Sequence, residues 1–263
     1  MEVYNKDGIK LWQGDSLELL KQIPDNSVDL IVTDPPYNTG MTENNTKKEN
    51  HKTARFSGNC PTWLGNFFND RYSKKEYNKL VKTITKEFFR VLKDNKAVYI
   101  YINWKQLGKW IYFLEKAGFK VKNTVVWDKV VHGLNYQNYA YTHEFIIYAV
   151  KGKFEVNNKS INDRNKGYYK DIWHIQRVID NNTESEHETI KHIEVVRLPI
   201  LHASNEGDLI LDAFLGSGTT AVACKQLNRR CVGIEIVPKY IEIAKKRLEQ
   251  ENIKKYIKQN EVR

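Results

Sequence analysis

The chain carries the stretch DLILDAFLGSGTT at residues 208–220. Its apolar first part, Leu209 to Ala213, is typical of a buried strand, and the glycine-rich turn from Phe214 to Thr220 opens a helix. Gly216 and Gly218 have no Cβ atom, so the backbone of this turn can approach a ligand closely. A strand, a glycine turn and a helix in this order predict an α/β fold with a ligand at the turn.

The next strand, Arg230 to Glu235, ends in a carboxylate suited to binding the hydroxyl groups of a ribose. Loose Gly-x-Gly turns are common, and a NAD-binding Rossmann turn has nearly this look, so a NAD-linked dehydrogenase remains an alternative. Asp212 and Phe214 before the glycines, and the pair of threonines after them, favour a nucleoside that carries no pyrophosphate.

A second motif, Asp34-Pro35-Pro36-Tyr37, follows the apolar run at residues 28–32. Both prolines lack an N–H, so this turn leaves carbonyl oxygens unpaired, and the Asp34 side chain is a further acceptor. A flat exocyclic amine bonded to Asp34 and to the Pro35 carbonyl would be held with its lone pair toward an electrophile, while Tyr37 stacks on the attached ring. The alternative is an Asp-Pro turn that only closes a strand.

With these two motifs in this order, the chain resembles the β-class of DNA amino-methyltransferases, in which the Asp-Pro-Pro-Tyr motif precedes the glycine-rich cofactor motif. The resemblance extends over nearly the whole chain, at Gly14-Asp15, Thr33 to Tyr37, Trp127-Asp128-Lys129, His143-Glu144 and Phe214 to Thr220. It implies a Rossmann-like methyltransferase sheet with circularly permuted motif order and a small inserted target-recognition region. It also implies S-adenosylmethionine as the cofactor, and the N6 amine of adenine or the N4 amine of cytosine as the acceptor.

The resemblance further implies roles for individual residues. The expected catalytic residues are Asp34, Pro35, Pro36 and Tyr37. The expected cofactor-binding residues are Asp15, Asp34, Lys191, Asp212, Phe214, Gly216, Ser217, Gly218, Thr219, Thr220, Glu235 and Ile236. Asp15 also has the spacing of a helix capping box with Glu18, so both roles stay open. His143 and Glu144 are expected to be structural rather than catalytic.

One segment departs from the family pattern. Where the family usually shows His-Pro-Thr-x-Lys-Pro, this chain has HETIKH at residues 187–192, so both prolines are missing. The lysine that family members place near the methionine end of the cofactor is kept as Lys191.

Length and charge fit a protein that binds nucleic acid. The 263 residues can form one large α/β domain with an insertion. Lys and Arg number 42 against 32 Asp and Glu, giving a formal charge of +10 and a pI near 9.2. This balance favours a polyanionic partner such as double-stranded DNA. An AT-rich genome, whose codons over-use Lys, Asn and Ile, is the alternative explanation of the charge.

The cysteines and the hydropathy pattern indicate a reducing, aqueous compartment. Cys60, Cys224 and Cys231 lack the spacing of metal ligands or of a disulfide framework, so we expect reduced thiols and no metal site. The order Cys60-Pro61 reverses the Pro-Cys pair of C5-cytosine methyltransferases. No apolar stretch approaches membrane-spanning length, and no N-terminal apolar segment resembles a signal. We expect a cytoplasmic protein that associates with the nucleoid by binding DNA.

Short apolar runs alternate with amphipathic stretches, which is the pattern of a parallel sheet covered by helices. Beside those at 209–213 and 230–235, the expected strands are Ile9–Trp12, Leu30–Thr33, Ala97–Ile102, Val121–Trp127 and Glu144–Val150. The expected helices are Ser16–Gln22, Lys74–Leu92, Trp104–Ala117, Ile193–Ala203 and Pro238–Gln250. The block from Leu209 onward is expected to supply the central strand.

Two polar segments interrupt this alternation and are the expected DNA-facing additions. The loop at residues 38–72 is suited to close over an extruded base, since loops longer than about 30 residues are more often functional or disordered than idle; a surface insertion is the alternative. The segment at residues 151–186 lies where β-class enzymes carry their target-recognition region, and a structural connector is the alternative. The expected DNA-binding residues are Lys47, Lys48, Lys52, Arg55, Lys129, Arg164 and Lys166. The chain then divides into a catalytic half at 1–150, a target-recognition region at 151–186 and a cofactor-binding half at 187–263.

The sequence thus predicts a site-specific DNA methyltransferase that acts on the N6 amine of a flipped-out adenine. Adenine is favoured because cytosine enzymes of the family more often carry Ser at the position of Asp34. Alternatives are an N4-cytosine DNA enzyme, an RNA or protein amino-methyltransferase, and a catalytically inactive DNA-binding regulator. A cognate restriction endonuclease and a homodimer are possible partners.

Overall fold

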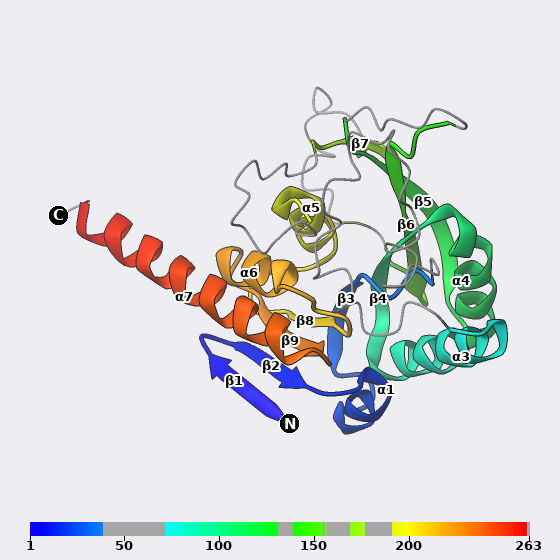
Figure 1. Ribbon diagram of the computed structural model, residues 1–263, viewed down its shortest axis with the longest axis horizontal. Coiled ribbons are helices and arrows are strands. Elements are labelled where there is room, and N and C mark those ends of the chain that lie inside the picture. The colour runs from blue at the N-terminus through cyan, green and yellow to red at the C-terminus, as the bar shows by residue number, and fades with distance from the viewer. Residues whose placement is uncertain (39–71, 131–138, 155, 157–168, 177–190, 262–263) are drawn as a thin grey trace, which may run out of the picture.

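The computed structural model describes residues 1–38, 72–130, 139–154, 156, 169–176 and 191–261, with side chains as far as residue 250. In this part of the chain, nine strands form one sheet in the order β1-β2-β9-β8-β3-β4-β6-β5-β7 (Figure 1). The strands are β1 (Glu2–Lys6), β2 (Ile9–Gln13), β3 (Val28–Thr33), β4 (Leu92–Ile102), β5 (Lys120–Asp128), β6 (His143–Lys151), β7 (Ile172–His174), β8 (Leu209–Asp212) and β9 (Arg230–Glu235). The helices are α1 (Ser16–Leu19) with the 3₁₀ turn η1 (Leu20–Gln22), α3 (Lys74–Val91), α4 (Trp104–Ala117), α5 (Ile193–Ala203), α6 (Thr219–Gln226) and α7 (Pro238–Glu261).

The sheet is mixed. Strands β2, β9, β8, β3 and β4 run parallel, whereas β1 is antiparallel to β2 and β6 is antiparallel to β4 and β5. The prediction of a parallel sheet is therefore wrong for β1 and β6. An apolar pattern indicates which residues are buried, but it does not indicate the direction of a strand. The reversal of β6 brings its amino end to the sheet edge where β3, β4, β5, β8 and β9 end.

The middle of the sheet is buried on both faces. All six residues of β3 are buried, and β3 is the fifth strand of the order, with β8 directly beside it. The strand expected to be central, β8, is therefore its neighbour. One face packs against α5, α6 and α7, and the other packs against α1, α3 and α4 (Figure 1). Such double coverage explains why β3 and β8 read as continuous apolar runs.

Capping residues fix the ends of α3 and α4, which cover one face of the sheet. Helix α3 begins with a reciprocal capping box between Ser73 and Glu76. Helix α4 begins at Asn103, whose side chain accepts from the Gln106 N–H, and ends at Gly118 with a φ of 110°. These caps explain why the α4 bounds match the sequence prediction. Within the described residues, no helix has the length and apolar character needed to cross a membrane.

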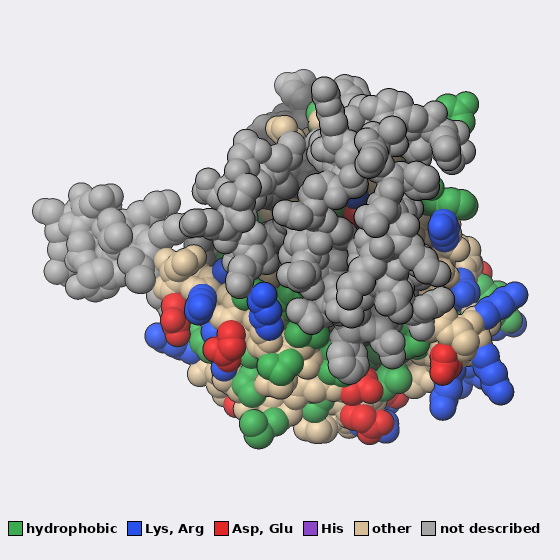
Figure 2. Space-filling model, viewed as in Figure 1, with side chains coloured by type: hydrophobic (Ala, Val, Ile, Leu, Met, Phe, Trp, Pro, Cys, Tyr) green, Lys and Arg blue, Asp and Glu red, His purple; other side chains and the backbone are tan. Residues whose placement is uncertain are grey.

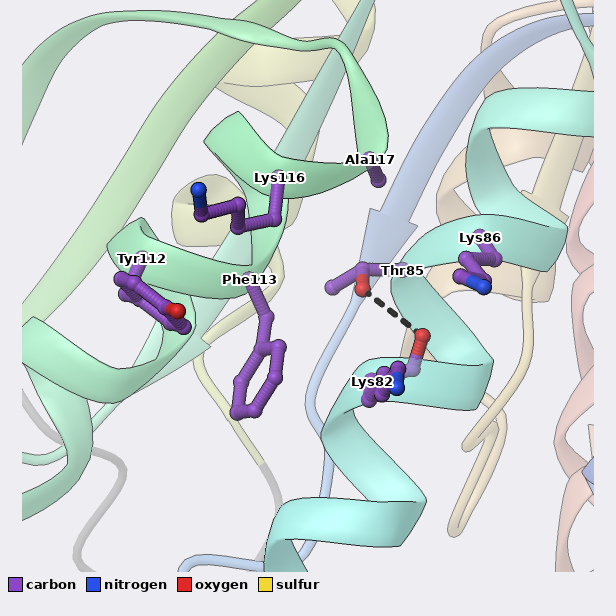
Figure 3. Close-up of a pocket in the computed structure, with 7 residues that line it drawn as sticks. All are labelled: Lys82, Thr85, Lys86, Tyr112, Phe113, Lys116 and Ala117. Atoms are coloured by element: carbon purple, nitrogen blue, oxygen red, sulfur yellow. Dashed lines mark hydrogen bonds between the residues drawn. The ribbon is translucent and has the colours of Figure 1, made fainter.

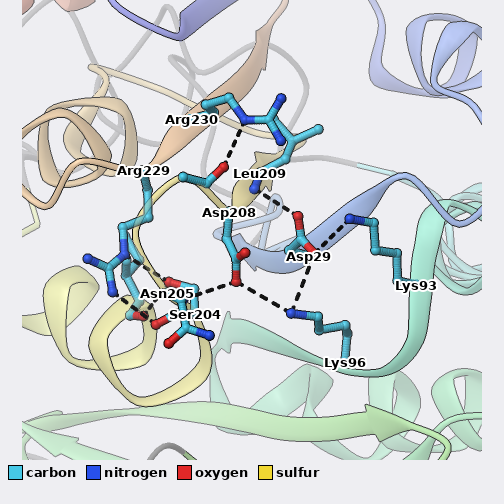
Figure 4. Close-up of polar contacts among 11 residues, drawn as sticks. Asp29, Lys93, Lys96, Ser204, Asn205, Asp208, Leu209, Arg229 and Arg230 are labelled. Atoms are coloured by element: carbon cyan, nitrogen blue, oxygen red, sulfur yellow. Dashed lines mark hydrogen bonds and ion pairs between the residues drawn. The ribbon is translucent and has the colours of Figure 1, made fainter.

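Charged side chains join the amino ends of the central strands, at the edge opposite the site described below (Figure 4). Asp29 of β3 accepts from the Leu209 N–H at 3.0 Å and pairs with Lys93 at 2.8 Å. Lys96 lies 3.4 Å from both Asp29 and Asp208. A buried carboxylate is costly unless paired, so these contacts favour one register of β3, β4 and β8.

Candidate active site

The predicted motifs converge at the edge formed by the carboxyl ends of the parallel strands. Asp34 follows β3, Asp212 ends β8 and Glu235 ends β9. β8 lies between β3 and β9, so the two motifs come from adjacent strands although they are about 180 residues apart in sequence. Open α/β sheets bind ligands at this edge. The fold therefore brings together the predicted catalytic and cofactor-binding segments.

The turn after β3 presents acceptors as the sequence predicted at Asp34 and Pro35, whereas the prediction of an unpaired carbonyl is wrong for Pro36. The Tyr37 hydroxyl donates to Asp34 Oδ1 at 2.7 Å, and the Pro36 carbonyl accepts from the Tyr77 hydroxyl at 2.8 Å. Within the described part of the chain, the Pro35 carbonyl accepts no hydrogen bond. Asp34 and the Pro35 carbonyl are thus a carboxylate and a backbone oxygen available to the same small donor group.

A group of four charged side chains surrounds this turn. The Lys191 ammonium lies 3.0 Å from Asp34 Oδ2 and 2.9 Å from Glu144 Oε2. Lys129 lies 2.6 Å from Glu144 Oε1, and the Tyr37 hydroxyl is 3.1 Å from Glu144 Oε2. We call Asp34, Lys191, Glu144 and Lys129 the charge tetrad. With two carboxylates and two ammonium groups, its formal charge is zero.

Burial and charge set the protonation of the tetrad. Burial raises the pKa of Asp34, and Lys191 opposes this rise without cancelling it. Burial alone would also raise the pKa of Glu144, but Lys191 and Lys129 outweigh it and hold that pKa at about 2. Burial would lower the pKa of Lys191, yet Asp34 and Glu144 raise it above its ordinary value. The two ammonium groups therefore favour the anionic form of Glu144, whereas burial and Lys191 act in opposite directions on Asp34.

Asp212 organises the backbone beneath the site. Its carboxylate accepts from the Thr33 hydroxyl at 2.8 Å, the Thr220 hydroxyl at 2.6 Å and the Phe214 N–H at 3.1 Å. Burial raises the pKa of Asp212 to about 6. These bonds tie the end of β3 to the glycine turn, so Asp212 connects the two motifs through their shared backbone.

The glycine turn has the backbone shape that requires glycine. Gly218 has a φ of 87°, and a Cβ there would lie 2.6 Å from the Ala244 Cβ. Glu235 accepts from the Gly216 N–H and the Val237 N–H, each at 2.8 Å. A carboxylate has about four acceptor sites, so Glu235 keeps capacity for the hydroxyl groups of a ribose. Ile236 beside it is 40% exposed.

The remaining predicted cofactor residues lie around the same turn. Asp15 caps α1 by accepting from the Leu17 N–H at 2.9 Å, but the expected capping box with Glu18 does not form, because the Glu18 side chain pairs with Lys21. The Ser217 and Thr219 side chains contact the Arg247 guanidinium at 3.2 and 3.1 Å. These contacts hold α7 against the turn.

The predicted DNA contacts are only partly placed. Lys129 points to Glu144, and its side chain is 18% exposed. The other predicted DNA-binding residues lie outside the described residues: Lys47, Lys48, Lys52, Arg55, Arg164 and Lys166. Cys60 and most of the segments 38–72 and 151–186 also lie outside them. Among the described residues, no group of three or more His, Cys, Asp or Glu side chains is placed to hold a metal ion.

The sequence reasoning missed the contact of Glu144 with the catalytic turn. Glu144 is the second residue of β6, and it reaches the site because β6 runs opposite to its neighbours. The only sequence signal was the pair His143-Glu144 at the start of an apolar run. The direction of a strand cannot be read from that signal.

The fold and the two motifs together define the class of the amino-methyltransferases. The DNA methylase family matches residues 28–246, and the chain belongs to this family. It is 31% identical over 250 residues to the Type II methyltransferase M.HinfI of Haemophilus influenzae, covering 90% of this chain and 67% of that one. It is 32% identical over 267 residues to M2.DpnII of Streptococcus pneumoniae, covering 95% and 92%.

Solved structures agree with this assignment. The complex of M1.HpyAVI with SAM superposes with a TM-score of 0.66 at 26% identity and covers 91% of this chain and 98% of that one. The PvuII DNA methyltransferase, described as cytosine-N4-specific, has a TM-score of 0.70 at 17% identity, with coverages of 91% and 86%. The second likeness concerns the fold alone.

Proposed function

We propose that this protein transfers a methyl group from S-adenosylmethionine to the N6 amine of adenine in double-stranded DNA. The observation that carries this proposal is the placement of the Asp34 carboxylate and of the Pro35 carbonyl, which accepts no hydrogen bond from the described residues, directly after β3 and next to the glycine turn that follows β8. Two acceptors beside a nucleoside site fit a planar amine as substrate. The residues around Gly216, Gly218 and Glu235 would hold the cofactor, whose sulfonium supplies the methyl group.

The chemistry requires orientation more than a covalent intermediate. The lone pair of an aromatic amine is delocalised into the ring, so the free amine is a weak nucleophile. Acceptance of its two N–H protons by Asp34 and the Pro35 carbonyl favours a more pyramidal nitrogen. Holding both reactants in near-attack geometry contributes about 7 to 11 kcal/mol to lowering the barrier.

The target base must leave the helix to reach this site. An amine within a duplex is buried in the base stack, and extrusion of the base costs a few kcal/mol. The Tyr37 hydroxyl donates to Asp34, and we assign to the Tyr37 ring the replacement of part of the lost stacking. We assign closure over the base to the loop at 38–72 and base reading to the segment at 151–186.

The acceptor base is tested by product analysis. We expect N6-methyladenine, because a carboxylate at Asp34 is a strong acceptor for the amine of the larger purine ring. DNA methylated by the purified protein is digested to nucleosides and analysed by mass spectrometry. N4-methylcytosine without N6-methyladenine would contradict the choice of base and leave the reaction class standing; transfer only to RNA or protein would contradict the DNA substrate.

The excess of positive charge is concentrated in one segment of the chain. Residues 73–122, which include α3, β4 and α4, contain 13 Lys and Arg against four Asp and Glu. The rest of the chain contains 29 and 28. A codon bias that acts on the whole gene does not explain such an uneven distribution. Figure 2 shows Lys and Arg side chains gathered over the side where Figure 1 places α3 and α4.

A groove between α3 and α4 carries part of this charge (Figure 3). Its volume is about 300 Å³, and Lys82, Lys86 and Lys116 line it together with Tyr112. All three lysines are exposed, and they lie in the middle and carboxyl-terminal parts of α3 and α4, whereas the amino ends of both helices lie at the catalytic edge. We propose that this face contacts the DNA backbone at a distance from the target base.

Charge reversal tests this face. The triple variant Lys82→Glu, Lys86→Glu and Lys116→Glu should weaken DNA binding at low salt. If each lysine contacts one phosphate, the slope of log affinity against log salt should become shallower by about 2.7. The matched control reverses the exposed lysines Lys6, Lys10 and Lys246, and binding is followed by fluorescence anisotropy. Equal slopes for the two triple variants would contradict a DNA-contacting role for the groove.

Two of the relatives are named Type II methyltransferases. A cognate restriction endonuclease and a second copy of this chain are the further partners considered. We propose that the protein protects DNA from a cognate restriction endonuclease and that it acts in the cytoplasm on the nucleoid. Resistance of DNA from expressing cells to restriction digestion tests the first point. Light scattering of the purified protein, with and without DNA, tests whether it forms a homodimer.

A further inference from the structure

The charge tetrad places an ammonium group on one of the two oxygens of Asp34. Lys191 Nζ lies 3.0 Å from Asp34 Oδ2, and the other Asp34 oxygen accepts from the Tyr37 hydroxyl. Each oxygen of Asp34 therefore already has one partner before any base arrives. If Asp34 binds the target amine, as the proposed function requires, the amine competes with Lys191 and the Tyr37 hydroxyl for these oxygens.

Releasing Lys191 from Asp34 would be costly without a second partner. The Lys191 side chain is only 14% exposed, and a buried charge that loses its partner destabilises a protein by several kcal/mol. Glu144 already lies 2.9 Å from the same ammonium and also contacts the Tyr37 hydroxyl at 3.1 Å. Both groups that compete with the amine for Asp34 are thus already in contact with the Glu144 carboxylate.

We propose that Glu144 is a positioning residue that takes over Lys191 and the Tyr37 hydroxyl when the target amine binds Asp34. Lys129, 2.6 Å away on the other Glu144 oxygen, holds the carboxylate in place during this exchange. No proton needs to move, since Lys191 only exchanges a carboxylate oxygen of Asp34 for one of Glu144. The inference rests on the proposed function, because it gives a role to the amine at Asp34.

The groups that face Asp34 from each neighbouring element define the expected pH behaviour. They are Tyr37 on its own turn, Tyr101 on β4, Glu144 on β6, Lys191 before α5 and Asp212 on β8. Among the two nearest charges, Lys191 lowers the pKa of Asp34 and Glu144 raises it. The acid limb is the part of the pH profile where activity falls as the pH decreases and Asp34 becomes protonated. Removal of Glu144 should move this limb to lower pH, and removal of Lys191 should move it to higher pH.

The test compares Glu144→Gln with Lys191→Met in methyl transfer to DNA at saturating cofactor. We expect Glu144→Gln to lower kcat/KM by about 10- to 100-fold at neutral pH, since Lys191 then stays on Asp34 and the amine is misplaced. Its acid limb should shift to lower pH, because Asp34 loses a neighbouring anion. Lys191→Met should shift the acid limb to higher pH. In the double variant, the Glu144→Gln change should cost little, because no ammonium remains to be moved.

Controls separate this role from simple support of the fold. Glu87→Gln removes a carboxylate of similar exposure that pairs with Arg90 far from the site, so it should leave the rate and the pH profile unchanged. Melting temperature and cofactor affinity are measured for every variant. A wild-type protein without DNA methylation would overturn the proposed function. Two outcomes in an active wild-type background would overturn this inference alone. One is a Glu144→Gln variant whose activity falls at the same acid pH as in the wild type. The other is a double variant whose loss of kcat/KM is the product of the two single losses.

Discussion

Asp34→Ala is expected to abolish methyl transfer while the protein stays folded and binds its cofactor. The carboxylate accepts from the amine most strongly as positive charge develops on nitrogen, so its loss acts on the transition state. Loss of one such preorganised group costs about 10²- to 10³-fold in kcat, and Asp34 also orients the acceptor. The fold should survive because Lys191 keeps Glu144 as a partner at 2.9 Å.

This expectation is measured with labelled cofactor under single-turnover conditions and with calorimetry for cofactor binding. Tyr37→Phe and Tyr37→Ala are the companion variants. The phenylalanine keeps the stacking ring but loses the hydroxyl that donates to Asp34, so it should lie between wild type and Tyr37→Ala. Substantial turnover by Asp34→Ala would mean that another group accepts the amine protons.

Gly218→Val is expected to remove binding of S-adenosylmethionine, with a loss of at least about 100-fold. The φ of 87° at Gly218 is strained for any β-branched residue, and the new Cβ would meet the Ala244 Cβ at 2.6 Å and its Cα at 3.0 Å. Both atoms belong to α7, so relief of the clash must displace either this helix or the turn. Displacement of the turn moves the backbone that would contact the nucleoside.

Gly216→Ala is the matched control for this glycine. Gly216 also has a positive φ, 56°, but an added Cβ meets no heavy atom of the described residues within 4 Å. It should therefore lose stability of about 1 kcal/mol from backbone strain and keep much more affinity. Calorimetry with S-adenosylmethionine and with NAD, together with thermal melting, distinguishes a lost site from a lost fold. Binding of NAD, or unchanged affinity in Gly218→Val, would show that the site is misplaced.

Sequence reasoning succeeded where local chemistry ends an element. The bounds Trp104–Ala117 and Arg230–Glu235 agree with the structure, because Asn103, Gly118 and the carboxylate of Glu235 mark the ends. The short edge strands β1 and β7 were missed, since half-exposed strands of three to five residues carry little apolar pattern. Helix α7 continues to Glu261, beyond the predicted end at Gln250, because no Gly or Pro follows that residue.

In the site too, local motifs could be predicted from the sequence, and contacts between distant strands could not. Asp34 to Tyr37 and the glycine turn could be recognised in the sequence because each motif has its own local chemistry, and the structure places the two motifs after adjacent strands; their roles stay predictions. Glu144 and its ion pair with Lys191 depend on the antiparallel placement of β6. Contacts made by strand order and direction are properties of the whole sheet, so no single stretch of sequence reveals them.

The order of strands also has a consequence for synthesis of the chain. β8 and β9 fill the gap between β2 and β3, yet they are made about 180 to 200 residues later. At translation speeds of 5 to 20 residues per second, the apolar edges of β2 and β3 that later pair with β9 and β8 stay unpaired in the nascent chain for about 10 to 40 s. During this interval, pairing of β2 or β3 with a neighbouring nascent chain on the same polysome competes with correct folding.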